Sequence, residues 1–412
     1  MYMKKTVMRK YAKLAVQKGV NLQKGQAAVI QASVSEHEFA EMVAEEAYRA
    51  GAKWVRMEWT DQTVTRLHYR HQTLTELCKV ADWTVEKMKF TAKELPCMIH
   101  IASADPDGMK GINPAKMQKA MIAQSKVFKP IRNQMESKYQ WTIVAVPSPK
   151  WAKKVFPGER TSTAVEKLWG EILKAVRVTE DNDPVAEWSS HNQRLADKCE
   201  KLNALDLEYL HYQAPNGTDF TCWLIPGHRW VGGCETLKTT GVDFNPNMPS
   251  EEVFTSPLKG KCEGTLVATL PLSYQGVLID SFSMDFKDGK AVAVHAGEHQ
   301  ELLERMITMD EGACMLGELA LVPNDSPISN SGVLFYNTLF DENAACHVAL
   351  GRGFNEALEG FENMSDQEIK DAGINDSMIH VDFMIGCKEL NITGHTRDGR
   401  DVAIFTDGNW AI

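Results

Sequence analysis

The sequence lacks the patterns that mark several common classes of protein. No Cys-x-x-Cys pair occurs among its nine cysteines, and their odd number does not fit a disulfide framework, so a zinc ribbon and a disulfide-rich secreted domain are both excluded. We therefore expect reduced thiols and a cytoplasmic location. No run approaches the roughly 18 apolar residues that a membrane-spanning helix needs, and the basic N-terminus lacks the apolar core of a signal peptide.

The signatures of several enzyme classes are also missing. No Gly-x-x-x-x-Gly-Lys-Ser/Thr occurs, and no Gly-x-Gly-x-x-Gly follows the first predicted strand, so neither common nucleotide-binding motif is supported. The sequence has neither the His-Glu-x-x-His of thermolysin-type zinc sites nor the Gly-x-Ser-x-Gly of serine hydrolases. A net charge of −10 without a long basic block argues against nucleic acid as the main partner.

What is present is the composition of an ordinary globular protein. Of the 412 residues, 43% are hydrophobic and 24% are charged. A chain of this length is expected to form two or three domains. The turn cluster Asp-Asn-Asp-Pro at 181–184 is a candidate boundary. We therefore expect one domain over residues 1–184 and a second over residues 185–412.

The first of these regions alternates short apolar runs with helical patterns. The apolar runs lie at residues 27–31, 54–59, 97–102 and 141–146. Short apolar strands separated by helices are typical of a mostly parallel sheet covered by helices on both faces. We therefore expect an α/β N-terminal domain.

The second region carries a different pattern, in which Asx-Gly pairs separate extended runs. These pairs are Asn216-Gly217, Asp288-Gly289 and Asp398-Gly399. Such pairs between strands favour tight hairpin turns. We therefore expect an α+β C-terminal domain with largely antiparallel strands, and we expect it to carry a metal site.

Six acidic and histidine side chains in this second region are candidate metal ligands. The six are Glu252, Glu318, Glu342, His347, His380 and Asp382. Carboxylates and imidazoles bind hard or borderline divalent metals. His380 and Asp382 stand two apart in a run of strand formers, so they project from the same side of a strand. A solvent-facing alternation of polar residues is the alternative interpretation of this pair.

The other candidates also allow plainer interpretations. Glu318 lies in an apolar run, where a carboxylate is costly unless it is paired or metal-bound, but it could instead face water from an edge strand. Glu342 and His347 would lie about 140° apart on a regular helix, so a turn must separate them; Asp341 could cap a helix there. Ser250 could cap a short helix that makes Glu252 an ordinary first-turn acid.

Taken together, four segments resemble the M29 family of metallo-aminopeptidases. They are Asn-Met-Pro-Ser-Glu-Glu-Val-Phe-Thr at 247–255, Gly-Glu-Leu-Ala-Leu-Val at 317–322, Phe-Tyr-Asn-Thr-Leu-Phe-Asp-Glu-Asn-Ala-Ala-Cys-His at 335–347, and His-Val-Asp-Phe-Met-Ile-Gly at 380–386. Their order and spacing match the family from about residue 205 to the C-terminus, and the set of four is far more specific than any one of them.

The resemblance implies a function and a ligand set. It implies that the six candidate residues hold two cocatalytic divalent ions, for which mixed carboxylate and imidazole ligation fits Zn, Co or Mn. It implies peptide substrates with a free N-terminus and a homodimer; we expect no nucleic-acid or membrane partner. Glu318 is then the expected proton carrier and a candidate bridge between the ions.

One position departs from the family pattern. The family commonly has a catalytic tyrosine seven residues after the histidine of its Cys-His pair, and this chain has Phe354 there. A phenyl ring cannot donate a hydrogen bond to an oxyanion, so Tyr336 is the candidate replacement donor. Two other functions stay open at this point: a different dinuclear-metal hydrolase, and a weakly active peptide-binding relative.

Overall fold

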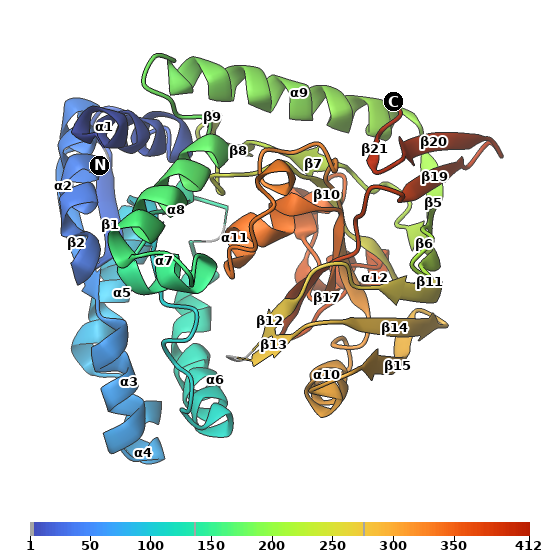
Figure 1. Cartoon of the computed structure of the whole chain (residues 1–412), viewed down its shortest axis with the longest axis horizontal. Coiled ribbons are helices and arrows are strands. Elements are labelled where there is room, and N and C mark those ends of the chain that lie inside the picture. The colour runs from blue at the N-terminus through green and yellow to red at the C-terminus, as the bar shows by residue number, and fades with distance from the viewer. Residues whose placement is uncertain (1–3, 136, 275–276) are drawn as a thin grey trace. The chain divides into compact units, whose positions relative to one another are not determined.

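The computed structural model describes residues 4–135, 137–274 and 277–412, and its contacts divide them into two compact units (Figure 1). The N-terminal unit comprises the chain up to Ser189 together with Cys234–Pro249. The C-terminal unit comprises Ser190–Gly233 and Ser250–Ile412. The first division between them falls inside the long helix α9 (Pro184–Ala204).

The N-terminal unit is an α/β domain, as predicted. Its main sheet has the strand order β2-β1-β3-β4, and every pair in it is parallel. These strands are β1 (Ala27–Ser33), β2 (Trp54–Thr60), β3 (Cys97–Ala102) and β4 (Trp141–Ala145), and a small antiparallel pair is formed by β8 (Glu235–Leu237) and β9 (Val242–Phe244). The four apolar runs therefore become the strands of one parallel sheet.

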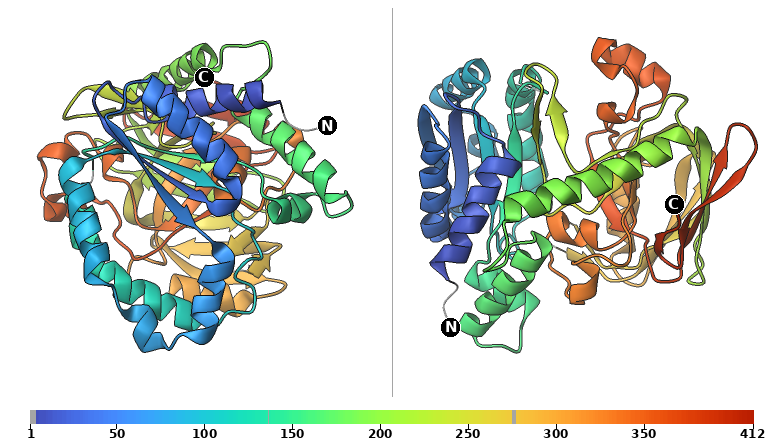
Figure 2. Two further views of the ribbon diagram at one scale, coloured as in Figure 1. Left: turned by 90° about the vertical axis from the view of Figure 1, so that its left-hand side faces the viewer. Right: turned by 90° about the horizontal axis from the view of Figure 1, so that it is seen from above.

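Helices of this unit lie beside the sheet, and some of them extend beyond its end (Figure 1 and Figure 2). They are α1 (Lys5–Leu14), α2 (His37–Arg49), α3 (Gln62–His71), α4 (Leu74–Cys78), α5 (Asp82–Glu94), α6 (Pro114–Arg132), α7 (Pro149–Val155) and α8 (Thr161–Ala175). Among the described residues, none of the helices is both long and apolar enough to cross a membrane.

The C-terminal unit is built on antiparallel strands, which confirms the predicted α+β class. An eight-stranded sheet has the order β15-β14-β11-β6-β5-β19-β20-β21, and a five-stranded sheet has the order β18-β17-β16-β10-β7. The first contains β5 (Leu207–Gln213), β6 (Asp219–Leu224), β11 (Pro257–Val267), β14 (Phe282–Lys287), β15 (Lys290–Ala296), β19 (Asn391–Thr396), β20 (Asp401–Thr406) and β21 (Asn409–Trp410). The second contains β7 (Val231–Gly232), β10 (Val253–Thr255), β16 (Leu316–Leu321), β17 (His347–Gly351) and β18 (His380–Met384).

Shorter elements complete this unit. They are the hairpin of β12 (Leu272–Tyr274) with β13 (Val277–Ile279) and the helices α10 (Gln300–Ile307), α11 (Thr338–Asp341) and α12 (Asp366–Ala372). The three Asx-Gly pairs join β5 to β6, β14 to β15 and β19 to β20, as predicted. The segment before Asp288-Gly289 forms two strands, because residues 277–279 pair with β12 and only β14 pairs with β15.

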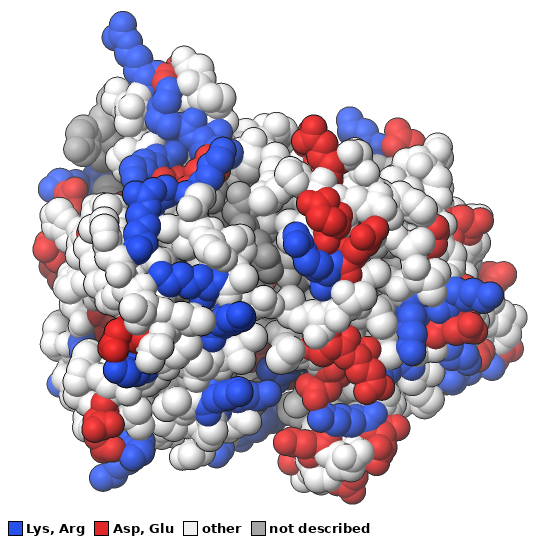
Figure 3. Space-filling model, turned by 90° about the horizontal axis from the view of Figure 1, so that it is seen from below, with Lys and Arg blue, Asp and Glu red and all other residues white. Residues whose placement is uncertain are grey.

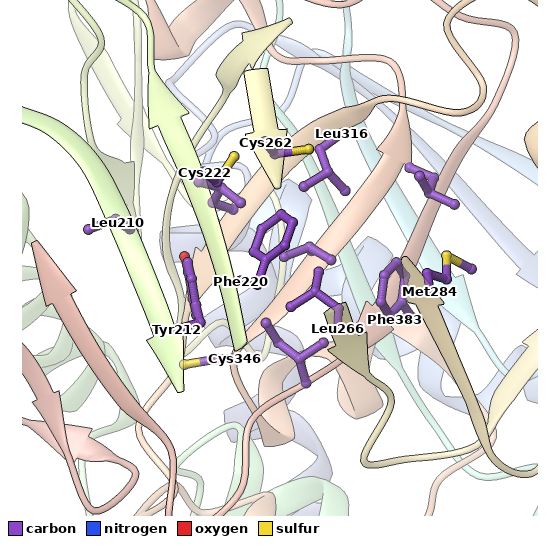
Figure 4. Packing of buried hydrophobic residues seen from close by; sticks show 14 of the residues in the cluster. Leu210, Tyr212, Phe220, Cys222, Cys262, Leu266, Met284, Leu316, Cys346 and Phe383 are labelled. Carbon is purple, nitrogen blue, oxygen red and sulfur yellow. The ribbon is translucent and has the colours of Figure 1, made fainter. Parts of the chain in front are cut away.

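The two sheets of the C-terminal unit share one hydrophobic core (Figure 4). The eight-stranded sheet contributes side chains such as Phe220 and Leu266, and the five-stranded sheet contributes Leu319, Val348 and Phe383. Because neighbouring residues of a strand point to opposite faces, the residues between these core positions on β16, β17 and β18 point to the other face of the five-stranded sheet.

A β-bulge at Gly317 determines which side chains of β16 point to that other face. Leu316 pairs with Leu350, whereas Glu318 pairs with Ala349, so one extra residue lies on β16 between them. With strict alternation Leu316 and Glu318 would share a face. The bulge lets Leu316 enter the core with Leu350 while Glu318 turns away from it, as bulges beside functional sites commonly do.

Glycine is required at the bulge because the neighbouring backbone is too close for a side chain. A Cβ on residue 317 would lie 2.3 Å from the carbonyl oxygen of Arg352 and 2.4 Å from that of Gly351. We therefore expect Gly317→Ala to lower the free energy of unfolding by about 1–3 kcal/mol, the usual cost of overpacking. Chemical denaturation followed by tryptophan fluorescence measures this loss.

The control is Gly297→Ala, because residue 297 has no atom within 4 Å of an added Cβ and needs no left-handed backbone. This variant should unfold at the wild-type denaturant concentration. Equal midpoints for Gly317→Ala and the wild type would contradict the requirement for glycine.

Candidate metal centre

Adjacent strands of the five-stranded sheet bring acidic and histidine residues onto one face. Glu318 lies opposite Ala349 of β17, and Ala349 lies opposite Asp382 of β18. His347 lies opposite Ala320, two residues after Glu318. Since paired residues of neighbouring strands share a face, Glu318, His347 and Asp382 all project to the same side.

The remaining candidates join this face from its margins. Glu252 immediately precedes β10, which pairs with β16. His380 begins β18, two residues before Asp382, so the two share a face as predicted. Glu342 lies in the 3-10 turn Glu342–Ala344 just before β17, and this turn is what separates it from His347.

Two groups of potential ligands form on this face and share one residue. Glu252, Glu318 and His347 form the first group, and one ligand atom from each lies within 4.8 Å of the others. Glu318, His380 and Asp382 meet the same criterion and form the second. The shared residue, Glu318, is only 4% exposed. This arrangement offers two adjacent sites with a carboxylate common to both.

Both histidines are oriented as metal ligands usually are. The Nδ1 of His347 donates to the carbonyl oxygen of Ala345 at 3.2 Å, and its Nε2 lies 3.3 Å from Glu252. The Nδ1 of His380 donates to the carbonyl oxygen of Arg352 at 2.8 Å, and its Nε2 lies 3.1 Å from Glu318. A backbone carbonyl on Nδ1 fixes the tautomer and directs Nε2 to the site.

The site contains more acidic than basic side chains, which favours the binding of cations. Burial raises the pKa of Glu318 to about 7, and burial together with the charges of Glu252 and Asp382 raises the pKa of Glu342 well above its usual range. Four carboxylates therefore crowd a volume in which His347 and His380 supply positive charge. Like charges in a buried place raise each other's pKa values, so the group is poised to bind divalent ions.

The neighbouring carboxylates favour the charged form of both histidines. Burial favours neutral His347, but the hydrogen bond and charge of Glu252 outweigh burial and raise the pKa of His347 to about 10. Burial likewise opposes a charged His380, but Asp382 and Glu318 raise its pKa to about 11. For Asp382, burial is outweighed by attraction to His380, which lowers the pKa of Asp382.

Steric and hydrogen-bonding features also fit a metal. Ala349 separates Glu318 from Asp382 across three strands, and its small side chain leaves room between the carboxylates. The Oδ1 atom of Asp382 is buried and accepts no aligned hydrogen bond from any described residue, although His380 Nε2 lies 3.2 Å away. An orphaned carboxylate oxygen beside two further acids is suited to coordinating an ion.

Two buried residues that the sequence did not single out hold the ligand segments in place. The side-chain oxygen of Asn343 accepts from the backbone N–H of Glu251 at 2.6 Å, and its amide nitrogen donates to the carbonyl of Leu339 at 3.0 Å. Asn343 therefore ties the segment that precedes Glu252 to the turn that contains Glu342. The second residue, Asn375, donates to the carbonyl of Gly351 at 2.6 Å and braces the end of β17.

Asp341 occupies the N-cap position of the 3-10 turn Glu342–Ala344, as was considered from the sequence, but its side chain makes no capping hydrogen bond there. The carboxylate of Asp341 accepts from the backbone N–H groups of Phe335 at 2.8 Å and of Asn337 at 2.9 Å. It thereby closes a tight loop around Tyr336, whose φ of +55° is rare for a residue with a side chain. Burial raises the pKa of Asp341 to about 7 despite these bonds.

The two aromatic positions lie on different sides of the ligands. Tyr336 is half-buried and lines a small hollow together with Asp382. The ring of Phe354 contacts the ring of His380 edge-on, with centroids 4.9 Å apart, and also packs against Phe254. Phe354 therefore stands directly beside a candidate ligand.

The plainer interpretations of the acids are wrong. Glu318 does not face water from an edge strand, because β16 lies between β10 and β17 and the side chain is buried. Residues 250–252 lie in no helix, so Glu252 is not a first-turn acid. All six residues considered from the sequence thus gather at one place.

Comparisons with known proteins agree with this geometry. The family model described as thermophilic metalloprotease (M29) matches residues 4–410. Aminopeptidase AmpS of Bacillus subtilis is 42% identical over 402 residues, covering 97% of each chain. Aminopeptidase T of Thermus thermophilus is 38% identical over 406 residues, covering 98% of each chain.

A solved structure from the same group of proteins has the same fold. The structure of wild-type AmpT from Thermus thermophilus superposes with a TM-score of 0.91 at 37% identity, covering 99% of this chain and 100% of that one. The resemblance drawn from four short segments is therefore confirmed over the whole length, and this chain belongs to the M29 family of metalloproteases.

Proposed function

We propose that this protein is a metal-dependent aminopeptidase that removes N-terminal residues from peptides with the help of two divalent ions. The observation that carries the proposal is the pair of ligand groups that share Glu318, in a chain that belongs to the M29 family. Relatives that cover nearly its whole length are named aminopeptidases, which supports the exopeptidase activity.

Each group of residues would hold one ion. Glu252, Glu318 and His347 would hold the first, and Glu318, His380 and Asp382 the second. Glu342, whose carboxylate interacts electrostatically with Glu252 and Asp382, would be a further ligand. When bound, two such ions lower the pKa of water near neutrality and polarise the scissile carbonyl. Carboxylate and imidazole ligands suit Zn, Co or Mn, and the affinity order alone does not select among them.

The chain's own part in the chemistry is proton transfer and orientation. Glu318 stands at the centre of both groups, so its carboxylate is placed to take the proton of the attacking water and to deliver it to the leaving amine. The backbone carbonyls of Ala345 and Arg352 keep the two imidazoles turned toward the ligands. Burial of the site limits competition by bulk water.

The charge of the C-terminal unit suits a cationic N-terminus. Asp and Glu outnumber Lys and Arg in this unit by more than two to one, whereas Lys and Arg are in excess in the N-terminal unit. Figure 3 shows clusters of acidic side chains on one face of the molecule. An acidic surface attracts positively charged ligands and raises their rate of encounter, which favours peptides with a free amino terminus.

We also propose that two copies associate as a homodimer in a cytoplasmic compartment. Large apolar side chains are exposed on helices of the N-terminal unit, among them Leu67 on α3, Trp83 and Phe90 on α5, and Met121 on α6. Large exposed apolar side chains are candidate contacts in a protein interface. The nine cysteines form no disulfide, and all of them lie in the described residues, which supports a reducing compartment.

The test of the proposed function is blocking of the substrate amine. Acetylation of the N-terminus of a good peptide substrate removes the charge and the lone pair that the site is proposed to bind, so the rate should fall by a factor of about 100 or more. Product analysis by mass spectrometry measures both the rate and the cleavage position. Equal cleavage of the free and acetylated peptides at internal bonds would identify an endopeptidase instead.

A second prediction separates proton transfer from metal retention. Glu318→Gln keeps the shape of the side chain and an oxygen that can still coordinate an ion, but it cannot accept the proton. Turnover should therefore fall by roughly 10²–10⁴-fold in a folded protein that retains metal. His347→Ala and Asp382→Ala should instead reduce the metal content per chain below the two ions expected for the wild type. Elemental analysis after gel filtration, run beside steady-state kinetics, distinguishes the two effects.

The matched control for this series is Glu301→Gln, which neutralises an exposed glutamate on α10. It should retain both wild-type turnover and metal content. Wild-type turnover by Glu318→Gln would remove that residue from the mechanism, whatever the other variants do.

A third prediction concerns the two aromatic positions. If the hydroxyl of Tyr336 donates to the developing oxyanion, Tyr336→Phe should lower turnover by about 10²–10³-fold, the usual cost of one such donor, with metal content unchanged. Phe354→Tyr should then have little effect. Tyr209→Phe on the eight-stranded sheet, where the ring stacks on His395, serves as the control. A gain of turnover in Phe354→Tyr with none lost in Tyr336→Phe would assign the donor to position 354.

A further inference from the structure

A hollow lies beside the second group of candidate ligands within the C-terminal unit. Its volume is about 90 Å³, and Asp382 forms part of its wall. The wall also includes Met384 on β18, Leu272 on β12 and Leu278 on β13, with Leu334 from the loop before Tyr336. The wall thus combines a candidate metal ligand with four aliphatic side chains, and Ser273, Asn337 and Thr338 add polar groups to it.

The alternation of β18 explains this juxtaposition. His380, Asp382 and Met384 occupy every second position of the strand, so all three project to one face. Across the ladder, Met384 pairs with His347. On β18 the two candidate ligands are therefore followed on the same face by the apolar side chain of Met384. A substrate bound at Asp382 would have its neighbouring atoms in contact with Met384.

The acidic groups in this wall are already engaged. Asp382 belongs to the ligand group, and the carboxylate of Asp341 accepts from the backbone N–H groups of Phe335 and Asn337 at 2.8 and 2.9 Å. The residues that line the hollow include no lysine, arginine or histidine, and all of them lie in the described part of the chain. A charged side chain would therefore find no oppositely charged group that is not already engaged, whereas an aliphatic one would contact the side chains of Leu272, Leu278, Leu334 and Met384.

The volume restricts what can enter. A cavity of about 150 Å³ lined by Leu, Ile and Phe is enough for benzene. A hollow of about 90 Å³ is therefore too small for an aromatic ring without rearrangement, and it suits roughly four non-hydrogen atoms. Leucine, isoleucine, valine and methionine side chains have three or four such atoms.

From these observations we infer that the hollow between Asp382 and the β12–β13 hairpin binds the side chain of the substrate's N-terminal residue, and that it selects aliphatic residues. The inference rests on the proposed aminopeptidase function, because that function places the N-terminal residue at the ligands. To the proposed function the inference adds the chemical class of the substrate's first residue. The preferred substrates are peptides that begin with leucine, methionine, isoleucine or valine.

The first arm of the test measures selectivity in the metal-loaded wild-type protein. Dipeptide amides that vary the first residue as Gly, Leu, Met, Phe, Lys or Glu are compared by kcat/KM, and a second series varies only the second residue. Leu and Met in first place should exceed Phe, Lys and Glu by about 10-fold or more, since one or two misfitting groups cost that much in an apolar pocket. A preference for Lys would overturn the inference.

The second arm alters the hollow at Leu278, which is half-buried and outside the proposed machinery. Leu278→Ala enlarges the hollow and should raise the Phe-to-Leu ratio of kcat/KM by about 10-fold. Leu278→Phe fills it and should lower kcat/KM for Leu while leaving Gly unchanged. Val292→Ala on β15, where the side chain is 59% exposed, is the control and should alter neither ratio.

The outcomes separate this inference from the proposed function. If both Leu278 variants fold and cleave but change all first residues equally, or discriminate at the second residue, the hollow is not the subsite and the aminopeptidase assignment stands. If no peptide with a free N-terminus is cut by the metal-loaded wild type, the proposed function fails instead. If Leu278→Ala does not fold, Leu278→Phe still decides between these outcomes.

Discussion

Crowding of four carboxylates around two histidines is the interaction on which the rest of the C-terminal unit depends. Glu252, Glu318, Glu342 and Asp382 carry more negative charge than His347 and His380 can balance in a buried place. Such a cluster is unfavourable unless cations offset its repulsion. Its geometry must therefore be enforced by the surrounding fold, and this requirement accounts for the features that lie around it.

The five-stranded sheet supplies that enforcement through its two faces. One face is fixed in the hydrophobic core by residues such as Leu319, Val348 and Phe383, and the alternate positions carry Glu318, His347 and Asp382. A shift of register by one residue would exchange the two sets and bury the charges in the core. The energy of apolar packing therefore sets the position of each ligand, although none of these core residues belongs to either ligand group.

Buried polar residues outside the ligand groups hold the segments that the strands do not. Asn343 joins the entry to β10 to the turn that carries Glu342, and Asp341 closes the loop that presents Tyr336. Asn375 braces Gly351 at the end of β17, next to the carbonyl of Arg352 that orients His380. Buried hydrogen bonds of this kind cost much when one partner is removed, so they keep the loops from adjusting away from the ligands.

Sequence alone determined the class of each unit and the residue types of the site. Apolar runs separated by helical patterns led to β1–β4, the Asx-Gly pairs led to three hairpins, and four short segments led to the family. These signals are local, because strand period and turn preference depend on neighbouring residues. They also pointed to the acids and histidines, but they left Glu252 and Glu318 open to plainer interpretations.

Only the tertiary structure decided how those residues meet. The bulge at Gly317 reverses the direction of Glu318 relative to Leu316, and it becomes visible only when β16 is paired with β17. The role of Asn343 likewise depends on Glu251, 92 positions away in the chain. Register and long-range hydrogen bonds are set by packing between distant segments, which no local pattern encodes.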